Sequence, residues 1–354
     1  SNTLQVLHND GAGNFASAGA VSTGAGSQPS SIDAVPIFSE DPTLAGVLDF
    51  AVSLKGSGAI GIFYNPGSGL PYAFPIFTLP GGLFPTGVRG VDIDNNRFFD
   101  LVAANSGDGT VSVYMRQPSD PKSGAVPGFD DPITLAVGED PIGTAAADLD
   151  GDGLVDITTV NGLSNSVSVL LNRTAGTAAT FAPAVTLPTG GAPASIVVGD
   201  FDLDTAPGDA PDLDIALTAR ATTAPDAPRV IKIIRNDRAN GVLVLAPDAD
   251  IAVDGAPKIV VAEELDATPG ADLLALNLTG ALGFNGGVSA KAQVLPSVVR
   301  PRCTPGDIDC NGVVNGADLA ALLSAWGQAG GAADLNADGV VDGADLATLL
   351  GNWG

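Results

Sequence analysis

Basic residues are scarce in this chain of 354 residues. It contains 15 Lys and Arg residues against 40 Asp and Glu residues, which gives a formal net charge of -25. A surface so poor in basic side chains cannot neutralise many phosphates, so the composition argues against nucleic acid and anionic membranes as partners. Cations are the partners that this charge balance favours.

Long apolar segments are also missing, because no run of about 18 uninterrupted apolar residues occurs. We therefore expect no membrane insertion. The only cysteines, Cys303 and Cys310, lie close together in a Pro/Gly-rich stretch. We expect a local disulfide, with two free thiols as the alternative, and a disulfide implies secretion. The chain begins at Ser1 rather than Met, which is compatible with a removed signal peptide.

Histidine occurs once, as His8, which we interpret as a strand residue rather than a general base. No Gly-x-Ser-x-Gly elbow or phosphate-binding glycine loop stands in a suitable context. The dense carboxylate clusters are better explained by cation ligation than by acid-base catalysis. We therefore expect a protein without enzymatic activity, with a polysaccharide lyase or hydrolase as the alternative.

Glycine and proline are abundant, at 46 and 26 residues, and the apolar runs between them are short and rich in Val, Ile and Leu. This pattern is typical of turn-rich β structure. Five copies of an acidic segment support it: the clearest, DLDGDGLVDITTVN, covers residues 148–161, and the others begin at 41, 92, 200 and 264. Their period of roughly 50 to 65 residues suits a four-stranded unit.

Each unit has a strand before the acidic loop, a β-branched strand after it, a third strand that often closes on Asn, and a fourth strand. Such units must stack their sheets, and radial stacking predicts a mainly β fold of the β-propeller type. A β-sandwich array is the alternative. The first residues match a third strand, so they either complete the fifth blade or belong to a sixth blade of a larger ring.

These segments resemble the FG-GAP/VCBS repeats of integrin-alpha-like propellers, and two copies keep a Gly-Ala-Pro element at 191–193 and 255–257. The resemblance extends over most of residues 1–298. It implies a propeller with five motif-bearing blades that displays a glycan or protein ligand. It leaves the function open, because such propellers serve adhesion, ligand display and in some cases catalysis.

Carboxylates at alternate positions of a tight turn can converge on a hard cation such as calcium. The most complete loop offers Asp148, Asp150, Asp152, the Leu154 carbonyl and Asp156. The second loop offers Asp92, Asp94, Asn96 and Asp100, and the third offers Asp200, Asp202, Asp204 and Asp214. The remaining loops are eroded and not expected to bind, with Asp41, Thr43, Ala45 and Asp49 in one and Glu264, Asp266, Thr268 and Asp272 in the other. The alternative is that these residues only form turns.

The C-terminal segment repeats a second acidic pattern, DIDCNGVVNGAD at 307–318 and DLNADGVVDGAD at 334–345. Both fit the EF-hand spacing of ligands at positions 1, 3, 5, 7, 9 and 12. The first loop supplies Asp307, Asp309, Asn311, the Val313 carbonyl, Asn315 and Asp318. The second supplies Asp334, Asn336, Asp338, the Val340 carbonyl, Asp342 and Asp345. Position 12 is Asp in both, where EF-hands have Glu.

A helix is predicted after each loop, because leucines and a tryptophan recur at i, i+3, i+4 and i+7 in 319–327 and 346–354. We expect the two apolar stripes to pack together, with Trp326 and Trp353 in the small core. Such a core needs calcium, and the predicted disulfide, for stability.

This segment resembles a type I dockerin, a calcium-folded all-α module that docks onto cohesin modules. The resemblance covers residues 303–354 and implies attachment to a cohesin-like or other extracellular protein. It departs at loop positions 10 and 11, where many dockerins have hydroxylated residues and this chain has Gly316-Ala317 and Gly343-Ala344. The expected organisation is a propeller at 1–298, a linker at 299–306 and a dockerin-like module at 307–354.

The favoured hypothesis is a secreted calcium-binding adhesion protein whose C-terminal module anchors a ligand-displaying propeller. Two alternatives stay open. One is a dockerin-bearing extracellular enzyme that acts on polysaccharides. The other is a structural subunit of an extracellular coat or fibre.

Overall fold

The computed structural model describes residues 2–11, 14–37, 48–65, 77–117, 128–176, 178–201, 212–236, 243, 245–253, 257–263, 272–279, 289–295, 306, 308, 314–328, 333, 335–336 and 340–353. The chain divides into two compact units, a larger one that holds the β-sheets and a smaller one that holds two helices. Cys303 and Cys310 lie outside the described residues, so their pairing remains a prediction.

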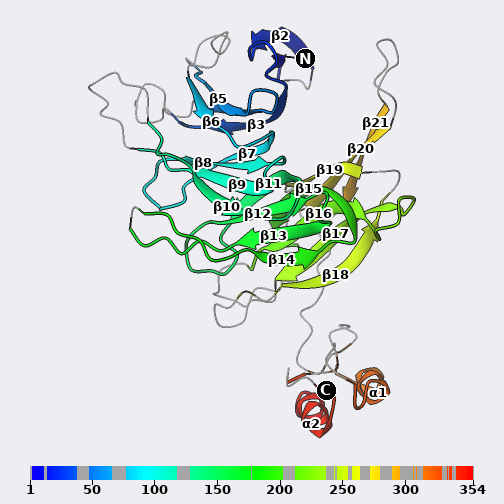
Figure 1. Cartoon of the computed structure of the whole chain (residues 1–354). Helices are drawn as coiled ribbons and strands as arrows, with labels where there is room; N and C mark the ends of the chain where they lie inside the picture. Colours follow the sequence, from blue (N-terminus) through cyan, green and yellow to red (C-terminus); the bar gives the residue numbers. More distant parts are fainter. Residues whose placement is uncertain are drawn as a thin grey trace. The chain divides into compact units, whose positions relative to one another are not determined.

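Five antiparallel meander sheets follow one another along the chain, as predicted for successive propeller blades (Figure 1). The first two are β3 (Pro29–Val35), β4 (Asp49–Leu54), β5 (Ala59–Phe63) and β6 (Phe77–Pro80), then β7 (Pro85–Val91), β8 (Asp100–Asn105), β9 (Thr110–Tyr114) and β10 (Ile133–Ala136). The next two are β11 (Pro141–Ala147), β12 (Asp156–Asn161), β13 (Ser166–Leu170) and β14 (Val185–Pro188), then β15 (Gly191–Gly199), β16 (Asp214–Arg220), β17 (Arg229–Asn236) and β18 (Leu245–Ala252). The fifth has three strands, β19 (Pro257–Glu263), β20 (Asp272–Thr279) and β21 (Ser289–Leu295).

The second strand of a blade is buried on both faces, which explains why its side chains are mostly apolar or small. In β8, Leu101 and Ala103 pack with Ile60 and Ile62 of the preceding blade. Val102, on the opposite face, packs in the cluster that includes Ile157 of the following blade. Because side chains alternate between the faces of a strand, neighbouring sheets must cover both sides. The mainly β fold built from four-stranded blades is thereby confirmed.

First strands of neighbouring blades are also joined by side-chain hydrogen bonds. Ser30 in β3 donates to the carbonyl of Pro85 in β7 at 2.9 Å, and Thr86 in β7 donates to the carbonyl of Pro141 in β11 at 2.7 Å. The hydroxyl of Ser195 in β15 accepts from the N–H group of Val260 in β19 at 3.3 Å. These bonds connect consecutive blades at their first strands.

The N-terminal strands β1 (Thr3–Asn9) and β2 (Phe15–Ser22) form a separate two-stranded sheet. In the described part of the chain this hairpin does not join β19–β21, so it does not complete the fifth blade. Val21 of β2 instead packs with Val52, Leu54 and Phe63 of the first blade. His8 lies in β1, as expected for a strand residue.

The smaller unit contains α1 (Gly316–Ser324) and α2 (Gly343–Gly351). Leu322 and Leu349 are fully buried in one core, and backbone bonds between Gln328 and Val341 and between Val341 and Gly327 join the two halves. Both helices begin three residues before the predicted ranges, at the last turn of each loop. No helix among the described residues is long and apolar enough to cross a membrane.

The expectation that Trp326 and Trp353 belong to this core is wrong, because each side chain is 47% exposed. The physical reason is helix length. Each helix ends two residues before its tryptophan, so the ring no longer continues the buried stripe. Leu322 and Leu349 are the fully buried residues of the two stripes.

Candidate calcium sites

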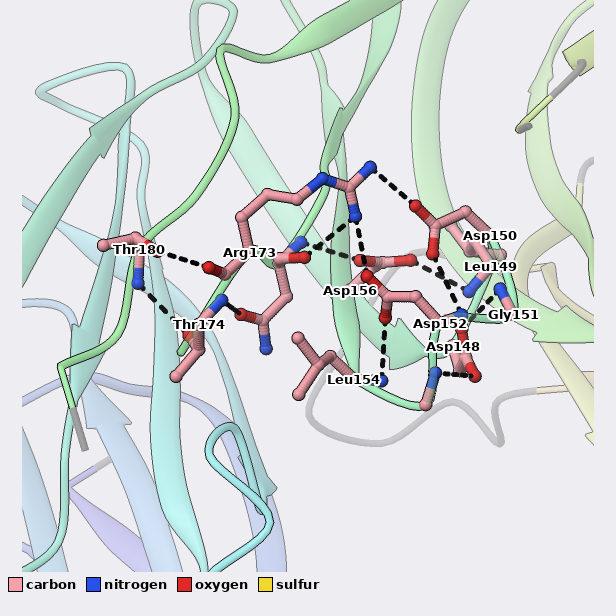
Figure 2. Close-up of polar contacts among 12 residues, drawn as sticks. Asp148, Leu149, Asp150, Gly151, Asp152, Leu154, Asp156, Arg173, Thr174 and Thr180 are labelled. Atoms are coloured by element: carbon pink, nitrogen blue, oxygen red, sulfur yellow. Dashed lines mark hydrogen bonds and ion pairs between the residues drawn. The ribbon is translucent and has the colours of Figure 1, made fainter. Parts of the chain in front are cut away.

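The acidic loop that joins β11 to β12 is folded around its own carboxylates (Figure 2). Asp148 accepts hydrogen bonds from the backbone N–H groups of Gly151 at 2.7 Å and Gly153 at 2.9 Å. Asp150 and Asp152 accept from N–H groups two residues further along, at 3.3 and 2.9 Å. Gly151 and Gly153 have φ values of 74° and 86°, which glycine adopts without steric cost.

The loop that joins β7 to β8 has the same construction. Asp92 accepts from the N–H groups of Asn96 at 3.0 Å and Arg97 at 2.8 Å, and Asp94 accepts from Asn96 at 3.2 Å. Asn95 and Arg97, at φ 57° and 75°, take the left-handed positions that glycines hold in the other loop. The side chains therefore form turns, as the alternative interpretation required. Turn bonds do not exclude ligation, because a carboxylate oxygen has two lone pairs.

Three carboxylate oxygens converge in each loop, all within 4.8 Å of one another. The two sets come from Asp92, Asp94 and Asp100, and from Asp148, Asp150 and Asp152. Calcium binds oxygen at about 2.3–2.6 Å, so two oxygens on opposite sides of one ion lie about 5 Å apart. The donors and their spacing therefore fit a single calcium ion in each loop.

The aspartate that opens the second strand has a further role that the sequence did not reveal. Asp156 is fully buried, and its two oxygens accept from the N–H groups of Leu149 at 2.9 Å and Asn172 at 2.7 Å. Asp100 makes the same two bonds in its own blade. Burial raises the pKa of Asp156 to about 6 and that of Asp100 to about 7, against the lowering effect of these donors. A nearby cation would favour their ionised forms.

The guanidinium group of Arg173 lies directly against the 148–156 loop (Figure 2). Arg173 Nη2 is 2.7 Å from Asp150 Oδ2, and Nη1 is 2.9 Å from Asp152 Oδ2. Nη1 also donates to the carbonyl of Asn172 at 3.0 Å. The hydrogen bond to Asp150 raises the pKa of Arg173. Sequence reasoning missed this residue, because it lies beyond the third strand of the blade.

Hydrogen bonds join acidic loops of successive blades. The Asn172 side chain donates to the carbonyl of Ile93, in the preceding loop, at 2.8 Å. The Asn95 side chain donates to the carbonyl of Gly153, in the following loop, at 2.8 Å. Asn236 makes the bond equivalent to that of Asn172 one blade later, at 2.7 Å. The Asn that often closes a third strand was visible in the sequence, but its role as a tie between blades was not.

The other propeller loops are only partly described. Asp214 accepts from the N–H group of Asn236, and Asp49 from that of Asn65, both at 2.9 Å, so the buried aspartate recurs in four blades. Asp200 is described, and Asp272 opens β20. The residues outside the description are Asp41, Thr43, Ala45, Asp202, Asp204, Glu264, Asp266 and Thr268.

In the smaller unit, predicted ligands cap the helices. Asp318 is fully buried and accepts from the N–H groups of Ile308 at 2.7 Å and Asn315 at 2.8 Å. Asp345 repeats these two bonds, each at 2.7 Å, and the N–H donor of Asp342 holds its pKa below the ordinary value. Asn336 and Val340 are described as well. The ligands outside the description are Asp307, Asp309, Asn311, Val313, Asp334 and Asp338.

Comparison with known families agrees with both resemblances. Residues 148–207 match the FG-GAP-like repeat, and residues 305–351 match the dockerin type I domain. The chain thus contains a propeller-type repeat followed by a dockerin module. Dockerin type I domains bind calcium and cohesin partners, and they occur in extracellular or cell-surface assemblies. No curated protein matches the sequence.

Two solved structures of similar fold are of proteins described as putative 6-phosphogluconolactonases. The protein from Bacteroides uniformis ATCC 8492 has 13% identity and a TM-score of 0.50, with 84% of this chain and 80% of that chain covered. The protein from Bacteroides fragilis NCTC 9343 has 12% identity and a TM-score of 0.52, with 84% and 79% covered. Identity this low shows the fold alone. The expectation of a protein without enzymatic activity is corrected to this extent: a fold shared with proteins described as lactonases does not favour the absence of catalysis.

Proposed function

We propose that this chain is a secreted calcium-binding protein whose dockerin module attaches a ligand-displaying propeller to a cohesin-like or other extracellular partner. The observation that carries the proposal is the duplication of the C-terminal module. Each half has a fully buried position-12 aspartate that closes its loop and caps its helix in the same way.

The two halves also present the same apolar pair to solvent. Leu323 and Trp326 are 53% and 47% exposed, and Leu350 and Trp353 have the same two values. Large side chains exposed beside a small core favour contact with another protein, because aromatic and aliphatic anchors supply much of the binding energy at interfaces. We assign the cohesin-like contact to these pairs, since loop positions 10 and 11 carry only Gly and Ala.

We propose that calcium binds to and stabilises both the propeller and the dockerin module. In the dockerin module the twelve EF-hand positions named from the sequence would bind two ions. In the propeller, the carboxylates of the loops after β7 and β11 would bind one ion each, and the loop after β15 would bind a third. A bound ion would hold each loop in one conformation, so that the residues around the loop form a rigid surface. We propose that this surface binds a glycan or protein ligand.

The docking proposal is tested with the full chain and a panel of cohesin modules immobilised on a sensor. Binding is expected in calcium and not in EDTA. Trp326→Ala and Trp353→Ala together should weaken it at least tenfold, whereas Leu163→Ala, which changes a leucine 70% exposed in the propeller, should leave it unchanged. No binding to any cohesin, with the module folded in calcium, would refute a cohesin-like partner.

The calcium proposal is tested by calorimetry on the full chain. Heat of calcium binding and a rise in melting temperature over EDTA are expected for both units. Asp94→Asn and Asp148→Asn should each remove one propeller site. If neither variant changes the number of ions bound, the propeller carboxylates only form turns.

A further inference from the structure

We propose that Arg173 is a built-in counter-cation of the 148–156 loop, and that calcium must displace its guanidinium group to bind there. This inference rests on the proposed calcium site and concerns its regulation. Two of the three converging carboxylates already pair with a guanidinium, so a positive charge lies at the cluster.

The guanidinium is held in place from several sides. Its contacts at 2.7 and 2.9 Å use one oxygen each of Asp150 and Asp152, and the carbonyl of Asn172 is a third acceptor. The backbone of Arg173 is fixed as well, because its N–H group donates to the Thr180 carbonyl at 2.8 Å and its own carbonyl accepts from the Thr180 hydroxyl at 2.7 Å. Figure 2 shows the side chain reaching from this short ladder to the loop.

Arginine and calcium compete because they need the same oxygens. Asp150 is only 4% exposed, so the guanidinium offsets a charge that water solvates poorly. Calcium bonded to Asp150 and Asp152 would offset both charges and leave the guanidinium beside a divalent cation, which repels it. A groove of about 310 Å³, lined by Arg173, Leu187 and Leu245 among others, gives the released side chain room to move.

The loop of the preceding blade is a natural comparison within the same chain. Its three carboxylate oxygens also lie within 4.8 Å of one another, and in the described residues no ion pair joins a basic side chain to Asp92 or Asp94. The buried Arg116 lies over the Phe98 ring of this loop, 4.8 Å from its centroid. The position that corresponds to Arg173 is occupied by Gln117, which donates to Asp130 instead. The 148–156 loop is therefore expected to bind calcium more weakly than the 92–100 loop, although its sequence motif is the more complete one.

Hydrogen-exchange mass spectrometry on the full chain, titrated with calcium chloride, resolves the two loops as separate peptides. In the unmodified chain, the peptide over 92–100 should become protected at a lower calcium concentration than the peptide over 148–156. Arg173→Gln should lower the midpoint of the 148–156 peptide about tenfold, since the ion pairs of the partly exposed guanidinium with Asp150 and Asp152 no longer compete. In EDTA the same variant should exchange faster at this loop, because Asp150 has lost its cation.

Arg89→Gln is the matched control. Arg89 is 41% exposed, compared with 44% for Arg173, and pairs at 3.8 Å with Asp33, outside the acidic loops. It should move neither midpoint. An unchanged or higher midpoint in Arg173→Gln, with calcium still protecting the loop, would overturn the counter-cation role alone. Absence of calcium protection at 148–156 in both chains would overturn the proposed site as well.

Discussion

Replacing Asn172 with alanine should weaken the contact between the third blade and the second and lower the stability of the propeller. The side chain is fully buried and makes three hydrogen bonds, two as donor to the carbonyls of Ile93 at 2.8 Å and Val155 at 3.1 Å, and one as acceptor from the N–H group of Thr174 at 2.9 Å. Alanine leaves these three groups without a partner. At about 1 kcal/mol for each, the loss of unfolding free energy is about 3 kcal/mol.

The expected change in melting temperature follows from that figure. For a domain of this size class, 1 kcal/mol corresponds to about 2–4 °C, so the variant should melt about 6–12 °C lower. Far-UV circular dichroism of the β-sheets is the appropriate assay. Tryptophan fluorescence serves as an internal reference, because both tryptophans, Trp326 and Trp353, lie in the smaller unit.

Two further variants make the experiment decisive. Asn14→Ala changes an exposed asparagine in the N-terminal hairpin and should cost less than about 0.5 kcal/mol. Asn172→Asp keeps the shape and the acceptor but turns a carboxylate oxygen toward two carbonyls, so it should be at least as destabilising as alanine. If Asn172→Ala melts within 2 °C (about 0.5–1 kcal/mol) of Asn14→Ala, the tie between the blades contributes little and the reasoning is wrong.

Four other outcomes are expected. Arg97 has a φ of 75°, which costs a residue with a side chain steric energy that glycine does not pay. Arg97→Gly should therefore raise the unfolding free energy, measured by urea denaturation, by about 0.5 kcal/mol, and a decrease would contradict this argument. Gly90→Ala places a Cβ atom 2.4 Å from a side chain of the first blade and should cost about 1–3 kcal/mol in the same assay; a neutral effect would show that the blades can separate. The pKa values of Asp100 and Asp156 are raised in the native state, so between about pH 4 and pH 8 the native state binds more protons than the unfolded state. In EDTA the melting temperature should therefore fall as the pH rises through this range. In calcium the melting temperature should change little with pH. We expect calcium to change the tryptophan fluorescence of the parent chain, and Asp345→Ala, which removes both a cap and a loop closure, should reduce that change; an undiminished response would contradict the role of Asp345.

The repeat and the helix pattern were enough to predict both folds. Short β-branched strands around each acidic loop specify a blade, and two copies of an EF-hand spacing specify the helical module. Periodicity could not place Trp326, because the register of an apolar stripe does not tell where the helix ends. That depends on how far the core extends, and here Leu322 closes it.

The candidate sites were predictable as groups of oxygens but not as electrostatic environments. The alternating aspartates in 148–156 predict a carboxylate cluster, and the structure brings three of them together. The role of Asp156 as a buried acceptor depends on Asn172, in a different part of the blade. The contact with Arg173 also spans strands, and no local pattern encodes it.

The paired amide bonds between neighbouring blades, from Asn172 to Ile93 and from Asn95 to Gly153, have a consequence for how ions would fill the propeller. An acidic loop held at two points by the next one cannot change shape alone. Occupancy of one site would then alter the affinity of its neighbour, and the same factor would apply in reverse. Cooperativity, seen as a saturation curve steeper than that of independent sites, would be the signature of this coupling.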